Sequence, residues 1–194
     1  MRRLVVALLS LGLVAVLVIG LTQAGGKTGD GAAKAPKFDV KAATAELADA
    51  EPAIAPLYER PSATVPGGVD AFEQRISSLR GNPVVVNKWA SWCHPCRAEF
   101  PIFQQVATKH GTDTAFMGIN GKDKRPAAER FLAAEPLPYL SYEDPDEEIA
   151  RARKISTYYP MTLFIDENGK TVGKHAGEYT SVAQLEADID KYLG

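Results

Sequence analysis

The fold is decided by residues 84–101, VVVNKWASWCHPCRAEFP. The first part, VVVNKW, is a β-branched run that follows the turn residues of 80–83, RGNP, and this pattern is typical of a strand buried in a sheet. Cys93 and Cys96 come next, and over 97–109 apolar residues recur at helical spacing. The stretch therefore predicts a buried strand, a turn that carries both cysteines, and a helix that begins beside them.

Strand and helix signals alternate on both sides of this stretch. A second strand over 114–119 completes a strand–helix–strand unit, which predicts two parallel strands joined by a right-handed crossover. The Asn168-Gly169 pair between two apolar runs is a strong hairpin signal, so the last two strands should be antiparallel. The other predicted elements are a broken helical segment over 40–58, helices over 71–79 (capped by Asp70), 125–134, 147–154 and 182–193 (capped by Ser181), and strands over 139–142, 161–166 and 171–175. The predicted fold class is α/β, with a central mixed sheet flanked by helices.

Composition excludes several classes of protein. The chain has 194 residues, of which 45% are hydrophobic and 24% are charged, as in a globular domain and unlike collagen, coiled coils or disordered chains. A formal net charge of -2 argues against nucleic acid as a partner, because phosphate contacts need clustered cations. With 2 Cys, neither a disulfide framework nor a four-thiolate zinc site can form. Any function of the thiols therefore involves this one pair.

The N-terminus carries a targeting signal. Arg2 and Arg3 precede the apolar run 4–21, LVVALLSLGLVAVLVIGL, which is long enough to cross a hydrocarbon core of about 30 Å as a helix. Positive charge before the run predicts an anchor with the rest of the chain outside the cytoplasm. The alternative is a cleaved signal peptide, for which 22–24, TQA, offers a small-residue cleavage site, and the domain would then be secreted or periplasmic.

Four segments are predicted along the chain. They are a signal anchor or signal peptide over 1–23, a flexible Gly- and Ala-rich linker over 24–37, a helical lead-in over 38–69 and the main domain over 70–194.

The two cysteines have the spacing of a redox pair. Unpaired N–H groups and the helix dipole at a helix start stabilise a thiolate and lower a Cys pKa from ~8.5 into the range ~3.5–7.5. A thiolate is the attacking species in disulfide exchange. Cys93, at the exposed end, is therefore the candidate nucleophile, and Cys96 is the candidate resolving thiol. Pro95 fits the first helical turn, where its missing N–H costs nothing.

The sequence leaves three other roles open for the pair. A structural disulfide over so short a loop would stabilise the fold little. Half of a metal site would need His94 or a distant His175 as a further ligand, and inert buried thiols fit poorly with the polar residues of 94–97. Redox chemistry is the favoured interpretation, without a cofactor or a metal ion.

Residues 89–96, WASWCHPC, lie between a buried strand and a helix that contains Pro101, and they resemble the active site of the thioredoxin superfamily. Tyr159-Pro160 before an apolar strand and the Asn168-Gly169 hairpin match as well, so the resemblance covers roughly residues 71–193 and implies a thioredoxin-like fold.

Within this superfamily, three features are similar to the membrane-anchored TlpA/ResA-type thiol-disulfide oxidoreductases. They are the apolar N-terminal segment, an extra helix and strand within 119–147, and Glu99 in Cys-x-x-Cys-x-x-Glu. Thioredoxin has an Asp where this chain has Asn87, which cannot accept a proton, and the resemblance implies that Glu99 takes that role for Cys96. The alternative for Glu99 is an exposed acid that suits the helix dipole.

The resemblance also implies a substrate-binding surface. Pro160 is expected to be a cis-proline that faces the Cys pair and leaves the backbone of Tyr159 free to pair with an extended substrate, although a proline can also simply begin a strand. Trp92 is expected at the apolar rim, and Trp89 in the core. His94 favours the thiolate when protonated, or else is a solvated loop residue.

By this resemblance the chain is expected to exchange disulfides with protein substrates outside the cytoplasm, more as a reductant than as an oxidant. Pro95 is similar to the proline of reducing members, and related reductants serve cytochrome c or copper-site maturation with electrons from a membrane partner. The alternatives are a copper-binding metallochaperone, since thiolates suit Cu(I), and a thiol peroxidase of the same fold.

Overall fold

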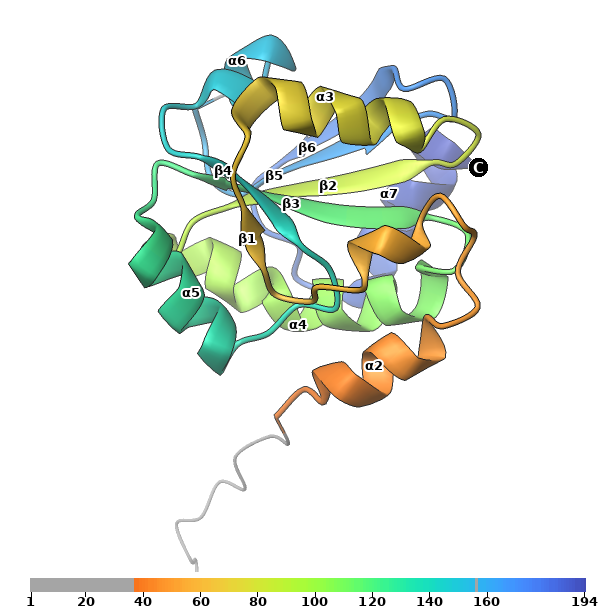
Figure 1. Cartoon of the computed structure of the whole chain (residues 1–194), viewed down its shortest axis with the longest axis horizontal. Coiled ribbons are helices and arrows are strands. Elements are labelled where there is room, and N and C mark those ends of the chain that lie inside the picture. Colours follow the sequence, from red (N-terminus) through yellow and green to blue (C-terminus); the bar gives the residue numbers. More distant parts are fainter. Residues whose placement is uncertain (1–36, 156) are drawn as a thin grey trace, which may run out of the picture. The chain divides into compact units, whose positions relative to one another are not determined.

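The computed structural model describes residues 37–155 and 157–194. Their strands form a 6-stranded sheet in the order β1-β4-β3-β2-β5-β6 (Figure 1). The strands are β1 (Thr64–Val65), β2 (Val84–Trp89), β3 (Ala115–Gly121), β4 (Ser141–Asp144), β5 (Met161–Ile165) and β6 (Thr171–Ala176). The helices are α2 (Val40–Glu46), η1 (Ala55–Leu57, a 3-10 turn), α3 (Gly68–Ser78), α4 (His94–His110), α5 (Arg125–Ala134), α6 (Glu148–Ala152) and α7 (Val182–Leu193).

The predicted mixed sheet is confirmed. β2 is parallel to β3, with Val84 opposite Ala115, and α4 connects the two strands as the sequence predicts. β4 is parallel to β3, whereas β5 is antiparallel both to β2 and to β6. Every residue of β2 is buried, because this strand lies in the interior of the sheet with helices on both faces.

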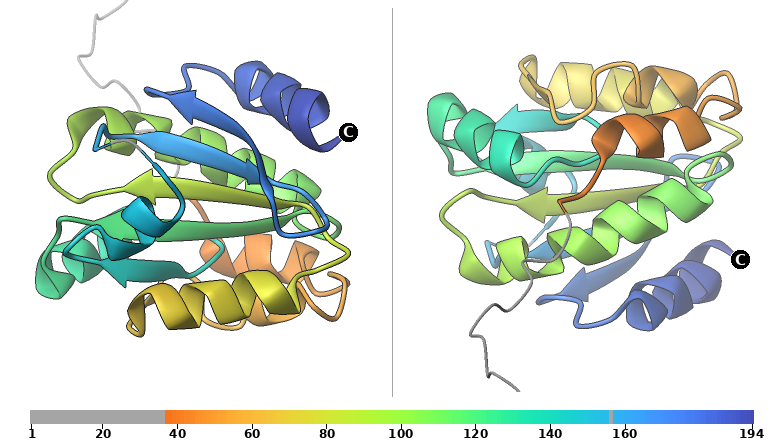
Figure 2. Two further views of the ribbon diagram at one scale, coloured as in Figure 1. Left: turned by 90° about the horizontal axis from the view of Figure 1, so that it is seen from above. Right: turned by 90° about the horizontal axis from the view of Figure 1, so that it is seen from below.

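Helices cover both faces of the sheet (Figures 1 and 2). α3 and α6 lie on one face, and α4, α5 and α7 lie on the other, where α2 packs against α4. Trp89 of β2 points toward the α4 face, where its ring lies 5.3 Å from that of Phe100 and 5.7 Å from that of Phe131. Its indole N–H donates a 3.0 Å hydrogen bond to Ser141 Oγ, so Trp89 belongs to the core as predicted.

Some predicted boundaries were wrong for local backbone reasons. α3 begins at Gly68 with Gly67 as its N-cap, so Asp70 lies inside the first turn and is not the cap. Gly67 has φ 120°, and a Cβ there would collide with Ala71 Cβ, which only glycine avoids. The helix predicted over 147–154 is limited to α6 because left-handed residues flank it.

β1 was not predicted, because its two residues are too short to show a period, and they pair with β4 in parallel. The predicted anchor over 4–21 and most of the linker lie outside the described residues. In residues 37–155 and 157–194, no helix is both long enough and apolar enough to cross a membrane.

Candidate functional site

Cys93 and Cys96 form a disulfide at the beginning of α4, with their Cα atoms 5.3 Å apart. Cys93 is the N-cap residue of the helix, and its Sγ accepts a 3.1 Å hydrogen bond from the backbone N–H of Cys96. A sulfur at an N-cap faces the unpaired N–H groups and the positive end of the helix dipole. When the disulfide is reduced, the same contacts favour the thiolate of Cys93 over its thiol.

The two cysteines differ in accessibility less than the sequence predicted. Cys93 is 3% exposed and Cys96 is 0% exposed, so both are buried and Cys93 alone meets solvent, through a small part of its surface. The description of Cys93 as an exposed residue was therefore wrong, although it remains the more accessible of the two. As an N-cap rather than a loop residue, Cys93 packs among the core residues at the end of β2.

His94 and Pro95 occupy the first turn of α4. His94 is exposed, and it borders a hollow of about 340 Å³ together with Arg97, Ala98, Pro101 and Glu135. Pro101 lies inside α4, at the position expected from the sequence motif. The hollow is the described cavity nearest in sequence to the Cys pair.

Glu99 is fully buried, one turn beyond Cys96. One carboxylate oxygen accepts a 2.7 Å hydrogen bond from the Asn87 side-chain amide, and the other accepts a 3.1 Å bond from the backbone N–H of Tyr179. Burial raises the pKa of Glu99 to about 8, although these two hydrogen bonds act to lower it. The alternative of an exposed first-turn acid is excluded.

The residues predicted for the substrate surface come from two separate loops. The Tyr159-Pro160 peptide bond is cis. Trp92 is 56% exposed, and its ring meets that of Tyr159 edge-to-face with centroids 5.0 Å apart. Tyr158 is 73% exposed. The loop before the Cys pair and the loop before β5 therefore meet in an exposed aromatic group.

Asp123, which the sequence analysis did not single out, fixes the loop before Cys93. Its carboxylate accepts hydrogen bonds from the backbone N–H and the hydroxyl of Ser91, from the Asn120 amide and from the backbone N–H of Lys124. The indole N–H of Trp92 adds a 2.8 Å bond to the Lys122 carbonyl. The turn signal of 120–124, NGKDK, is visible in the sequence, but its docking onto 91–92 depends on the fold.

Lys88 and Glu147 were also missed. Lys88 is fully buried in β2, and its Nζ lies 2.7 Å from Glu147 Oε1. The available signal was a lysine inside an otherwise apolar strand, since a buried charge requires a partner.

The alternative of a metal site at the Cys pair lacks a set of ligands in the part of the chain that is described. His175 Nδ1 lies 3.1 Å from Asp188 Oδ2, and its ring stacks on Tyr179 at 4.1 Å. His110 contacts Glu186 at 3.0 Å, at the end of α4 away from the Cys pair. Residues 37–155 and 157–194 contain no group of three or more His, Cys, Asp or Glu side chains that could hold a metal ion.

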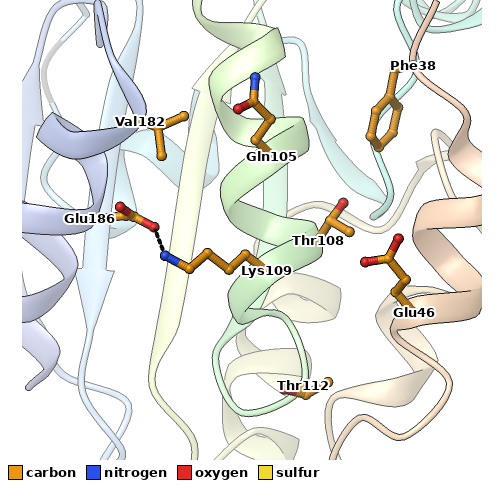
Figure 3. A pocket seen from close by; sticks show the side chains of 8 residues that line it. All are labelled: Phe38, Glu46, Gln105, Thr108, Lys109, Thr112, Val182 and Glu186. Carbon is orange, nitrogen blue, oxygen red and sulfur yellow. Dashed lines mark hydrogen bonds and ion pairs between the residues drawn. The ribbon is translucent and has the colours of Figure 1, made fainter.

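A second hollow, of about 720 Å³, lies between α2, α4 and α7 (Figure 3). It is lined by Phe38, Glu46, Gln105, Thr108, Lys109, Thr112, Val182 and Glu186. Figure 3 shows the Lys109–Glu186 ion pair joining α4 to α7. None of the predicted site residues lines this hollow.

A Cys-x-x-Cys disulfide at the N-terminus of the helix after a central strand, with a cis-proline before an antiparallel strand, is the arrangement of the thioredoxin superfamily. The model of the Redoxin family matches residues 59–189. The chain belongs to the Redoxin family, and the expected kinship with TlpA/ResA-type thiol-disulfide oxidoreductases is confirmed.

Two relatives and one solved structure illustrate this kinship. The thiol:disulfide interchange protein DsbE of Pseudomonas fluorescens biotype C is 36% identical over 118 residues, which are 60% of this chain and 64% of that protein. The thiol-disulfide oxidoreductase ResA of Oceanobacillus iheyensis is 30% identical over 105 residues, 53% of each chain. The match thus spans less than two thirds of either relative. The structure of a putative thiol:disulfide interchange protein DsbE from Chlorobium tepidum superposes with a TM-score of 0.56 at 31% identity, over 61% of this chain and 85% of that one.

Proposed function

We propose that this protein is a thiol-disulfide oxidoreductase that exchanges disulfides with protein substrates through Cys93 and Cys96. The observation that carries the proposal is the position of Cys93 Sγ, which accepts the Cys96 N–H at the N-terminus of α4. This position favours an ionised, nucleophilic sulfur in the reduced protein.

The reaction follows from the order of the two sulfurs. The Cys93 thiolate attacks one sulfur of a substrate disulfide, forms a mixed disulfide and releases the other substrate sulfur as a thiolate. The Cys96 thiol then loses its proton and attacks Cys93 Sγ, which re-forms the Cys93–Cys96 disulfide and releases the second substrate thiol. We assign the acceptance of the Cys96 proton to Glu99, because a carboxylate with a pKa of about 8 can exchange protons near neutral pH.

Substrate binding is assigned to residues on both sides of the disulfide. Trp92 lies in the loop before Cys93, and His94 and Pro95 lie in the first turn of α4. Tyr159 and Pro160 belong to the loop before β5. The exposure of Trp92 and its contact with the Tyr159 ring support a shared surface for an extended polypeptide.

The direction of electron flow is proposed to be reductive, in the maturation of cytochrome c or of a copper site, with a membrane protein as electron donor. Pro95 between the cysteines supports a reductant by similarity to reducing members of the superfamily. The apolar run 4–21 after Arg2 and Arg3 supports a location outside the cytoplasm. Residues 1–23 would anchor the domain through the linker, or be cleaved and release it.

The role of each sulfur is tested by trapping. Cys96→Ser, mixed with an oxidised polypeptide, should accumulate a mixed disulfide through Cys93 that dithiothreitol releases. The matched variant Cys93→Ser should trap nothing, and trapping by that variant alone would reverse the assignment. The reduction potential of the pair then tests the direction, because a value near about -270 mV supports a reductant and one near about -120 mV an oxidant.

A further inference from the structure

Lys88 is a buried charge that the exchange of disulfides does not require. It is 0% exposed on the central strand β2, and its Nζ lies 2.7 Å from Glu147 Oε1 and 3.9 Å from the centre of the Tyr159 ring. Replacing a buried ion pair by apolar side chains often leaves stability unchanged or improves it. A core lysine at this position therefore calls for a role other than stabilising the sheet.

Glu147 joins this lysine to the surface. Its Oε1 also accepts a 2.9 Å hydrogen bond from the Tyr159 hydroxyl, and its Oε2 pairs with Lys122 Nζ at 2.8 Å. Burial raises the pKa of Glu147, but the hydrogen bonds from Lys122, Lys88 and Tyr159 outweigh it and bring the pKa to about 2. The carboxylate thus stays ionised at neutral pH and holds three donors together.

The same residues close a ring of contacts around the exposed aromatic group. The Tyr159 ring packs against Trp92, whose indole N–H donates to the Lys122 carbonyl. The Lys122 side chain in turn pairs with Glu147, which binds the Tyr159 hydroxyl. The fit is tight, because a Cβ on Gly121 would collide with the Tyr159 hydroxyl. Trp92 directly precedes Cys93, and Tyr159 directly precedes the cis-proline. The ring therefore links the two loops that border the disulfide.

We propose that Lys88 and Glu147 are positioning residues that hold the Trp92–Tyr159 pair in one arrangement and so determine the affinity for polypeptide disulfides. This inference rests on the proposed function and adds a substrate-selecting role to residues that do not touch the sulfurs. A prearranged aromatic surface binds an extended chain with less loss of side-chain freedom. A small disulfide reaches Cys93 without using that surface, so its reaction does not depend on Lys88.

The kinetic test compares two lysine variants. Lys88→Met removes the buried ammonium, and Lys109→Met removes an exposed ammonium that pairs with Glu186, outside the ring of contacts. The probes are a synthetic peptide with one intramolecular disulfide and 2-hydroxyethyl disulfide, with dithiothreitol as electron source. Lys88→Met should raise KM for the peptide by roughly fivefold or more, as expected when a desolvated cation–π contact is lost. Its kcat, and its rate with the small disulfide, should match the wild type. Both rates of Lys109→Met should also match, since exposed ion pairs contribute little.

A spectroscopic test is independent of activity. The chain has 2 Trp, so a 15N-labelled sample gives two indole N–H signals, and buried Trp89 serves as the internal reference. In Lys88→Met the Trp92 signal should shift and exchange faster with water, whereas the Trp89 signal should stay in place and show that the domain is folded. Glu147→Gln, which removes the charge of the shared acceptor, should move the Trp92 signal in the same way.

The outcomes separate the two proposals. If wild type reduces neither disulfide, the proposed function fails. If wild type reduces both and Lys88→Met keeps the wild-type KM for the peptide or an unmoved Trp92 signal, the positioning role is wrong. An equal loss of rate with both disulfides in Lys88→Met also overturns it, because the lysine would then act on the sulfur chemistry itself.

Discussion

The side-chain amide of Asn87 donates a 2.7 Å hydrogen bond to Oε1 of Glu99 and thereby joins the central strand to the helix that carries both cysteines. The position at which thioredoxin has an acid is thus occupied by a donor, and the acid lies on the facing helix. Glu99 is fully buried with two hydrogen-bond donors for its two oxygens. Its protonation should therefore affect stability and, in the proposed mechanism, exchange.

Glu99→Gln should change the pH dependence of stability. The folded-state pKa of about 8 exceeds the unfolded value of 4.5, so the stability that protonated Glu99 contributes is complete below about pH 4.5 and is lost as the pH rises through about 8. Gln does not ionise, but it loses one acceptor for the Tyr179 N–H, at a cost of about 1 kcal/mol. The variant should be less stable at about pH 5 and more stable at about pH 9, by an amount on the order of a few kcal/mol.

Urea unfolding of the oxidised protein at several pH values measures this difference. Glu129→Gln, at an exposed carboxylate on α5, is the matched control and should follow the wild type at every pH. A constant offset between Glu99→Gln and the wild type across the range would show that Glu99 does not titrate there.

Reduced Cys93 should be ionised at neutral pH. As the N-cap of α4 its sulfur faces the helix N–H groups, so its pKa should lie below the ~8.5 of a free thiol, within ~3.5–7.5. The rate of alkylation by iodoacetamide, followed against pH by mass spectrometry, reports this pKa. The urea-unfolded protein is the control and should show the ordinary thiol value. A folded-state midpoint equal to the unfolded one would remove the basis for Cys93 as the nucleophile.

Asp123→Asn should loosen the loop before the disulfide. The replacement keeps the size of the side chain, but it leaves one acceptor oxygen in place of the two that bind the Ser91 and Lys124 donors. The loss should lower the free energy of unfolding by about 1–3 kcal/mol. We expect the Cys93–Cys96 disulfide to be reduced several-fold faster by dithiothreitol, because Cys93 becomes more accessible.

The matched variant for this prediction is Asp166→Asn in the β5–β6 hairpin. Asp166 Oδ1 accepts from the backbone N–H groups of Asn168 and Lys170. Asn keeps this acceptor but removes its negative charge, which weakens both turn hydrogen bonds, at a distant place in the sequence and the sheet. It should lower the urea midpoint and leave the rate of disulfide reduction unchanged. Equal reduction rates in both variants would refute a specific role of Asp123.

Ser141→Ala should destabilise the core through Trp89. The Ser141 hydroxyl is the acceptor of the buried indole N–H, and its removal leaves that donor unpaired at a cost of about 1–3 kcal/mol. Thr64→Val, across the β1–β4 pair, is a contrasting variant, because among the described residues the Thr64 hydroxyl is buried without a hydrogen-bond partner. Urea unfolding should show a clear loss for Ser141→Ala and no loss for Thr64→Val, and comparable losses would contradict this explanation.

Much of the fold was accessible from local sequence signals. The bounds of β2 and α5 agree with the sequence prediction, because each has a clear apolar period and distinct turn residues or a proline at its start. The hairpin of β5 and β6 was predicted from Asn168-Gly169. Helix α7 begins after its N-cap Ser181, whose side chain accepts a hydrogen bond from the backbone N–H of Gln184. Errors occurred where one left-handed residue, such as Gly67 or Glu147, decided where a helix begins.

From residue spacing alone, the site was predicted only as far as its residues are close in sequence, whereas the cis bond before Pro160 was predicted from the family resemblance. Cys93 and Cys96 share one turn, so their disulfide was foreseeable from spacing. The burial of Glu99 depends on Tyr179, which is 80 residues further along the chain, and no local pattern reports such a contact. The pairing of Lys88 with Glu147 likewise requires the sheet order, which brings β2 and the start of α6 together.

The two-residue strand β1 has a consequence for how molecules behave when crowded. A sheet border with unpaired N–H and C=O groups is a template on which another chain can add a strand and start aggregation. Here β1 occupies one border of the sheet and offers only Thr64 and Val65 for such an addition. This end of the domain is therefore a poor seed for fibril-like self-association, even where many copies lie close together.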